Sequence, residues 1–194
     1  PVRVIVLRDE DDHGVGKCGA NAPANLKTAD AWHLQIHQHP IVAVEPNTTT
    51  VAVTGRLMRV RAAGLADRQS GQPVIVLESG AVQAIETWNA VFDGVRALAP
   101  VIAYDRGGIG GPEFDGQPQT VSHVNESLHA LFSAMAIAAP YVLVGHSYGG
   151  VLIRAFAQKY PNEVAGLVYL DTPDTDLTIA DLNALSPDAL RLLR

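Results

Sequence analysis

Four short apolar runs are spaced along the middle of the chain, each bounded by glycine, proline or charged residues. They are Val74–Leu77, Val101–Tyr104, the run in PYVLVGHS and the run in VAGLVYLDTP. Runs without polar alternation are typical of strands buried on both faces of a parallel sheet. Ahead of them, TTTVAVTGRLMRVRAA alternates around Gly55, which predicts an antiparallel hairpin.

Stretches with helical spacing separate these apolar runs. They cover Ala84–Leu98, Ser122–Ala138, and Gly149–Tyr160, which stops before Pro161. A chain that alternates strand and helix builds a sheet with helices packed against it, joined by right-handed crossovers. The fold class is therefore α/β, with a mostly parallel central sheet and helices on both faces.

The first 46 residues do not continue this alternation. They hold a strand-like run, Val2–Leu7, then the acidic DEDD, a polar stretch, and AWHLQIHQHP. We divide the chain into an N-terminal region of unassigned origin, residues 1–46, and a core, residues 47–194. An apolar strand ending in acids with His13 close behind leaves two interpretations open. It is a solvated acidic loop, or a late element of the fold carried at the wrong end of the chain, as in a permuted domain.

Composition narrows the class of protein. The chain has 194 residues, 47% hydrophobic and 18% charged, which is enough for one globular domain with a substantial core. The net charge is −6 without a basic stripe, which argues against a nucleic-acid partner. No apolar run is long enough to span a membrane. Cys18 is the only cysteine, so it offers no internal disulfide and no zinc-ligand pair. We expect a cytoplasmic location, although a cleaved signal peptide would leave no trace in a chain that begins at Pro1.

The segment Gly145-His146-Ser147-Tyr148-Gly149 fits the pattern G-x-S-x-G between an apolar strand and an amphipathic helix. In that context the pattern predicts a nucleophile elbow, a strained turn that presents the serine hydroxyl at the carboxyl end of a sheet. Small residues two before and two after the serine let strand and helix approach closely. The helix N-terminus behind the serine favours developing negative charge.

Several motifs together resemble the α/β-hydrolase fold superfamily, especially its esterases and lipase-like members. Besides the elbow they are LESGAVQAIETW, YDRGGIGGP and YPNEVAGLVYLDTP, and the resemblance covers roughly residues 48–194. It implies a serine hydrolase that cleaves small-molecule carboxylic esters through an acyl-enzyme at Ser147, without a cofactor. A serine at the elbow argues against dehalogenase or epoxide-hydrolase chemistry, where look-alike folds use an aspartate.

The resemblance also implies roles for individual positions. The oxyanion hole would use the backbone N–H groups of Tyr148 and Ala81, the latter in the loop where Ser79 stands for the family's usual histidine. Asp171 closes the fourth apolar run, where some members of the superfamily place the catalytic acid; the alternative is a capping or loop aspartate. Asp105 and Arg106 are expected to be structural. The glycines of GGIGG do not fit a nucleotide-binding pattern.

The expected general base is missing from its usual place. The superfamily orders its triad as serine, acid, histidine, yet no histidine follows Ser147. His146 lies in the elbow, where the side chain normally points away from the serine hydroxyl. His123 and His129 belong to a helix and are expected to be solvated. In WHLQIHQHP, His33 and His37 share a helical face, but without the H-E-x-x-H pattern we expect no metal site.

Two functional interpretations remain. The chain is an active serine hydrolase with an unidentified histidine, or an incomplete, non-catalytic scaffold or fragment. The superfamily normally continues past this point with a lid and two more strands, so truncation explains the missing histidine. A truncated sheet would expose a long edge, which predicts a homodimer, a split partner or poor solubility.

Overall fold

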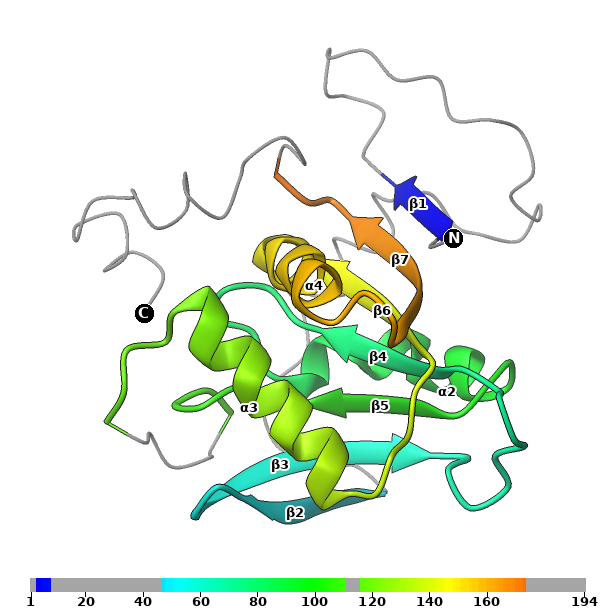
Figure 1. Cartoon of the computed structure of the whole chain (residues 1–194), viewed down its shortest axis with the longest axis horizontal. Coiled ribbons are helices and arrows are strands. Elements are labelled where there is room, and N and C mark those ends of the chain that lie inside the picture. The colour runs from blue at the N-terminus through cyan, green and yellow to red at the C-terminus, as the bar shows by residue number, and fades with distance from the viewer. Residues whose placement is uncertain (1–2, 8–46, 111–115, 174–194) are drawn as a thin grey trace.

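The structure, a computed structural model, describes residues 3–7, 47–110 and 116–173. Its centre is a seven-stranded sheet with the order β1-β7-β6-β4-β5-β3-β2 (Figure 1). The strands are β1 (Arg3–Leu7), β2 (Thr48–Val53), β3 (Arg56–Ala63), β4 (Val74–Glu78), β5 (Val101–Tyr104), β6 (Tyr141–His146) and β7 (Val164–Leu170). β3 runs antiparallel to both of its neighbours, β2 and β5, and all the other pairs of neighbouring strands are parallel, so the prediction of a mostly parallel sheet is confirmed.

The hairpin expected around Gly55 is β2 and β3. Thr54 and Gly55 join the two strands, both with positive φ, 49° and 85°. Two-residue hairpin turns favour positive φ at both central positions, because the resulting twist matches that of the flanking strands. The four apolar runs form β4 to β7, with every residue of β5 buried. Burial on both faces explains why these strands lack polar alternation.

Helices cover both faces of the sheet. Helices α3 (Val121–Ala134) and α4 (Tyr148–Lys159) lie in front of it in Figure 1, and α2 (Asn89–Arg96) lies on the other side. The largest group of buried side chains includes Leu131 and Phe156 from the two front helices. A second group packs Trp88 and Phe92 against the opposite face.

The segment expected to be one helix over Ala84–Leu98 is divided. It begins as a 3₁₀ turn, η1 (Ile85–Trp88), and continues as α2. Side chains three apart eclipse one another in a 3₁₀ turn. Ile85 and Trp88, at 0% and 1% exposure, therefore both face the core. The Asp105 carboxylate fixes this turn by accepting a hydrogen bond from the Ile85 N–H at 2.7 Å.

The N-terminal region contributes a strand to the same sheet. β1 pairs in parallel with β7 from Arg3 opposite Gly166 to Leu7 opposite Leu170. The edge of β7 is therefore occupied by β1, and β1 itself becomes the outermost described strand on that side. The homodimer stays a prediction. Among the described strands, β1 and β2 are the outermost.

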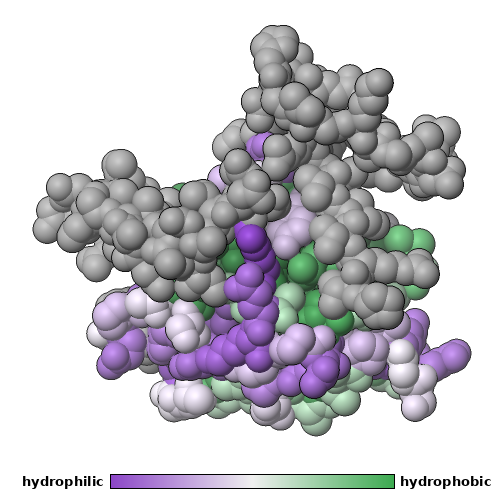
Figure 2. Space-filling model, turned by 45° about the horizontal axis from the view of Figure 1, so that its top comes forward, coloured by the Kyte–Doolittle hydropathy of each residue, from purple (hydrophilic) through white to green (hydrophobic). Residues whose placement is uncertain are grey.

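The surface of the described residues is mixed in character. Figure 2 shows polar residues across the lower part of one face, with hydrophobic residues exposed above them. The large hydrophobic side chains with the greatest exposure are Leu57, Val82 and Leu98. None of the described helices combines the length and the apolar character needed to cross a membrane.

Candidate active site

Ser147 lies in a turn of one residue between β6 and α4. Its backbone has φ 50° and ψ −123°, a region that non-glycine residues rarely adopt. The Ser147 N–H donates to the Leu170 carbonyl at 2.9 Å, and the Ser147 carbonyl accepts from the Gly150 N–H at 2.9 Å. These bonds hold the strained turn at the carboxyl end of the sheet, as the elbow pattern predicts.

The glycines of the elbow lie where no larger side chain fits. A Cβ on Gly145 would stand 2.6 Å from the backbone of Gly149 and Gly150. A Cβ on Gly149 would stand 2.7 Å from the Ser79 carbonyl oxygen and nearer still to that of Glu78. The first glycine lets α4 fold back over β6, and the second lets α4 contact the end of β4.

This close approach places the first turn of α4 beside the loop that follows β4. The loop contains Ala81, and α4 begins at Tyr148, whose N–H has no carbonyl partner inside the helix. The two backbone groups expected to form an oxyanion hole thus come from neighbouring segments. Burial raises the pKa of the Tyr148 phenol, and Tyr148 packs against a buried group made of Val121, Val124, Leu152 and Ala155.

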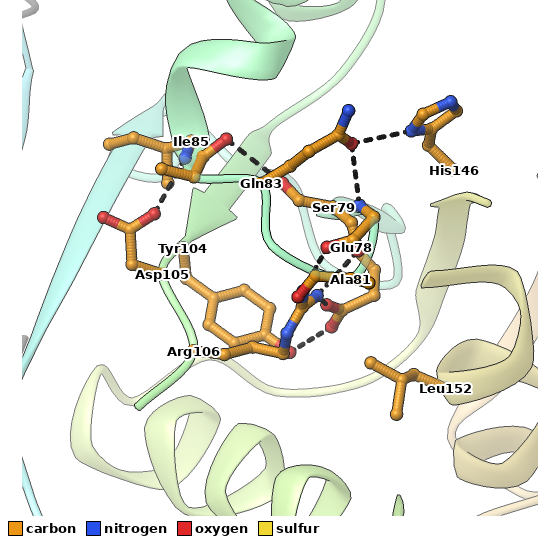
Figure 3. Close-up of polar contacts among 12 residues, drawn as sticks. Glu78, Ser79, Ala81, Gln83, Ile85, Tyr104, Asp105, Arg106, His146 and Leu152 are labelled. Carbon is orange, nitrogen blue, oxygen red and sulfur yellow. Dashed lines mark hydrogen bonds and ion pairs between the residues drawn. The ribbon is translucent and has the colours of Figure 1, made fainter. Parts of the chain in front are cut away.

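Gln83 links this loop to the elbow. Its side-chain oxygen accepts a hydrogen bond from the Gly80 N–H at 3.1 Å and lies 2.8 Å from His146 Nδ1. Figure 3 shows the His146 ring turned toward Gln83. His146 therefore packs on the loop beside Gly80, whose added Cβ would lie 3.3 Å from the ring.

A buried ionic cluster that no sequence motif had indicated lies beneath the same loop. Glu78 forms an ion pair with Arg106 and accepts a hydrogen bond from the Tyr104 hydroxyl (Figure 3). Glu78 and Arg106 are 1% and 5% exposed. Burial raises the pKa of Glu78 against the opposing attraction of Arg106, and burial followed by the Glu78 charge raises that of Tyr104.

A signal for this cluster exists in the sequence. Glu78 is a charged residue that directly follows four apolar ones, and β5 is followed by the charged pair Asp105 and Arg106. Since Leu77 pairs with Ala103 in parallel register, Glu78 and Tyr104 come to lie side by side. Charged residues at the ends of adjacent buried strands require partners, and here they supply one another.

Asp105 has the structural role that was expected. Its buried carboxylate pairs with Arg59 and accepts from the Ile85 N–H, and burial raises its pKa. Gly110 has φ +71° and packs directly on that carboxylate. Gly110 therefore lies against an aspartate, whereas Gly107 of the same loop lies against Arg56 and Gln119.

Asp171 lies directly after β7 and is exposed, with φ 45°. It follows Leu170, whose carbonyl receives the Ser147 N–H, so it adjoins the elbow along the carboxyl edge of the sheet. The next residue, Thr172, is buried against Gly150. Asp171 as the catalytic acid remains a prediction.

The described histidines are spread over both ends of the sheet. His129 lies 3.1 Å from Glu163, the residue before β7, and stacks on Tyr160, with ring centroids 4.2 Å apart. It therefore lies at the amino edge, opposite Ser147. His123 lies in the first turn of α3. The remaining histidines, His13, His33, His37 and His39, fall outside the described residues.

The part of the chain that the structure describes contains no candidate metal-binding site. No group of three or more histidine, cysteine, aspartate or glutamate side chains there is arranged to hold a metal ion. The metal interpretation of His33 and His37 concerns residues outside that part.

Comparison with known proteins agrees with this geometry. Residues 73–190 match the model of the alpha/beta hydrolase fold family. An AB hydrolase superfamily protein of Gibberella zeae is 31% identical over 108 residues, 52% of this chain and 33% of its own length. The chain belongs to the alpha/beta hydrolase fold family.

Solved structures share the fold at lower identity. Epoxide hydrolase A of Mycobacterium thermoresistibile superposes with a TM-score of 0.54 at 23% identity, over 64% of this chain and 39% of its own. The haloalkane dehalogenase DatA of Agrobacterium tumefaciens gives 0.56 at 20% identity, over 75% and 46%. The chain spans between 16% and 38% of the length of the first three curated relatives.

Proposed function

We propose that this chain carries the nucleophile and oxyanion hole of a serine hydrolase that cleaves carboxylic esters. The observation that carries the proposal is Ser147, held at positive φ between β6 and α4, beside the loop after β4. A non-glycine residue in a sparsely populated backbone region persists only where its surroundings hold it there, and such strain gathers at active sites. The family contains hydrolases of several kinds. The proposal of ester cleavage therefore rests on the serine at the elbow, where dehalogenases and epoxide hydrolases of similar fold use an aspartate.

The reaction follows from these positions. The Ser147 hydroxyl attacks the ester carbonyl while a histidine removes its proton, and the carbonyl oxygen becomes an oxyanion. The N–H groups of Ala81 and Tyr148 donate to that oxyanion, and the α4 N-terminus adds favourable potential. Collapse of the intermediate expels the alcohol, which takes the proton from the histidine. Water then attacks the acyl-serine while the histidine removes its proton. The acid is released, and the Ser147 oxygen takes the proton back from the histidine.

The acid and the base complete the proposal. Asp171 adjoins the elbow and is the candidate acid. His13 is the candidate base, because of the position of β1. The last residue of β1, Leu7, pairs with Leu170 of β7, and Leu170 pairs in turn with His146 of β6. The three strands thus end at one edge of the sheet, and the chain runs on from Leu7 toward His13.

The experiment compares the protein with Ser147→Ala, using a fluorophosphonate probe and p-nitrophenyl acetate. Labelling and turnover by the wild type, with neither in the variant, would support an activated nucleophile. Single changes to alanine at His13, His33, His37 and His39 would then identify the base. Replacing the base should lower the rate of ester hydrolysis by at least about a hundredfold. Absence of labelling in both proteins would refute the proposal and favour the non-catalytic scaffold.

A further inference from the structure

Arg106 touches more of the loop after β4 than any role as a partner for Glu78 requires. Its guanidinium donates to three successive carbonyls, Ser79 at 2.6 Å, Gly80, and Ala81 at 2.8 Å. Figure 3 shows the side chain reaching from the end of β5 under this loop. A lysine has one compact ammonium on a flexible stem and cannot reproduce a planar fork that reaches three acceptors.

Anchored carbonyls fix the direction of the N–H groups that follow them. A trans peptide is planar, with its C=O and N–H pointing in opposite directions, and the one cis bond among the described residues is Ala139–Pro140. Because the Gly80 carbonyl faces Arg106, the Ala81 N–H faces away from it. The Ser79 carbonyl fixes the direction of the Gly80 N–H in the same way, and the Gly80 N–H donates a hydrogen bond to the Gln83 side chain.

The guanidinium is itself held in place. One Glu78 carboxylate oxygen pairs with Arg106, and the other accepts from the Tyr104 hydroxyl. All three side chains are at most 5% exposed. The carboxylate therefore has little freedom to move, and the guanidinium has a fixed position relative to the end of β4.

We propose that Arg106, held by Glu78 and Tyr104, is a positioning residue that orients the Ala81 N–H as an oxyanion donor. It acts through the loop and does not touch the substrate. The inference rests on the proposed serine-hydrolase function, since an oriented donor matters only where an oxyanion forms. Loss of orientation weakens binding of the transition state far more than binding of the ester.

The test replaces Arg106 with lysine, which keeps the charge next to Glu78 and removes the fork. Arg68→Lys is the matched control, because Arg68 also donates to two backbone carbonyls, of Gln72 and Ala138, away from the site. We expect fluorophosphonate labelling of R106K to slow by roughly 10- to 100-fold, since removing a whole oxyanion donor costs about 100- to 1,000-fold. The KM for p-nitrophenyl acetate should change by less than about threefold.

Two further readouts separate positioning from general damage. The affinity for phenylboronic acid, which forms a tetrahedral adduct on serine, should fall in parallel with the labelling rate. Hydrogen–deuterium exchange of peptides covering residues 79–82 should accelerate in R106K and stay unchanged in R68K. If R106K folds as R68K does, and is labelled and exchanges as the wild type does, the inference is overturned.

Two other outcomes also bear on the role of Arg106. If the wild type is not labelled at all, the proposed hydrolase function fails, and the exchange of residues 79–82 alone decides whether Arg106 orders the loop. If R106K does not fold, Tyr104→Phe takes its place, because it removes only the hydrogen bond to Glu78. That variant should show a severalfold loss of labelling and boronate affinity at unchanged KM, and wild-type values would overturn the inference.

Discussion

The contact of Gly149 with the end of β4 yields a quantitative prediction about stability. In Gly149→Ala the new Cβ would stand 2.7 Å from the Ser79 carbonyl oxygen, 2.9 Å from the Glu78 carbonyl carbon, and closer still to the Glu78 oxygen. Ordinary contacts of a Cβ are 3.4–4 Å. All three obstacles are backbone atoms, so no side chain can rotate away, and α4 must shift away from β4.

Two opposing effects set the size of the change. Overpacking of a rigid contact costs about 1–3 kcal/mol, and the backbone obstacles favour the upper end. Alanine gains about 1 kcal/mol over glycine inside a helix. The net effect is a destabilisation of about 2 kcal/mol, which lowers Tm by about 4–8 °C in a chain of this size.

Gly94→Ala is the matched control. Gly94 is exposed in α2 and has nothing within 4 Å of a new Cβ, so only the helix propensity changes. This variant should gain about 0.5–1 kcal/mol. Urea denaturation followed by tryptophan fluorescence measures both variants against the wild type. A Gly149→Ala protein as stable as the wild type, beside a stabilised control, would refute the assignment of Gly149 as a packing-limited position.

Three other measurements test the packing and the sheet. Ser79→Ala removes the oxygen that accepts from the buried Trp88 Nε1 at 2.9 Å, and should cost about 1 kcal/mol in urea unfolding; an unchanged midpoint would argue against that bond. Burial raises the pKa of Tyr141 from 10.0 to about 12 while its hydroxyl donates to the Ile137 carbonyl at 2.9 Å. The resulting stabilisation is complete below pH 10 and disappears as the pH rises through 12, so the midpoint difference from Tyr141→Phe should shrink over that interval; a constant difference would contradict it. Deleting residues 1–46 uncovers the edge of β7 and should produce concentration-dependent self-association in light scattering; a strictly monomeric product would count against the pairing with β1.

The sequence was informative wherever local pattern determines structure. The continuous apolar runs predicted β4 to β7, and the alternation around Gly55 predicted the β2–β3 hairpin. The strand, turn and helix around Ser147 followed from five residues, because the turn needs small neighbours on both sides. The division of Ala84–Leu98 was missed, since it depends on a hydrogen bond from Ile85 to Asp105, twenty positions away.

The site was harder to predict because its supporting contacts join distant segments. The Glu78 carboxylate is marked in the sequence only by its place directly after four apolar residues. Its partners Tyr104 and Arg106 become visible only once the parallel register of β4 and β5 is known. The position of β1 was one of two open alternatives, and no local pattern could choose between them, since its partner lies roughly 160 positions further along the chain.

That long separation has a consequence for folding. Closing a loop of about 160 residues costs about 1.2 kcal/mol more in chain entropy than closing one of about 40 residues, the separation in sequence between Leu7 and the start of β2 that is left to close once the other strands are assembled. β1 is synthesised well before β7, and it is therefore expected to join the sheet last among the described strands, because its partner edge on β7 follows about 160 residues later. Ribosome-bound chains would carry that edge open until then, and this interval is when a chaperone or a second nascent copy would have access to it.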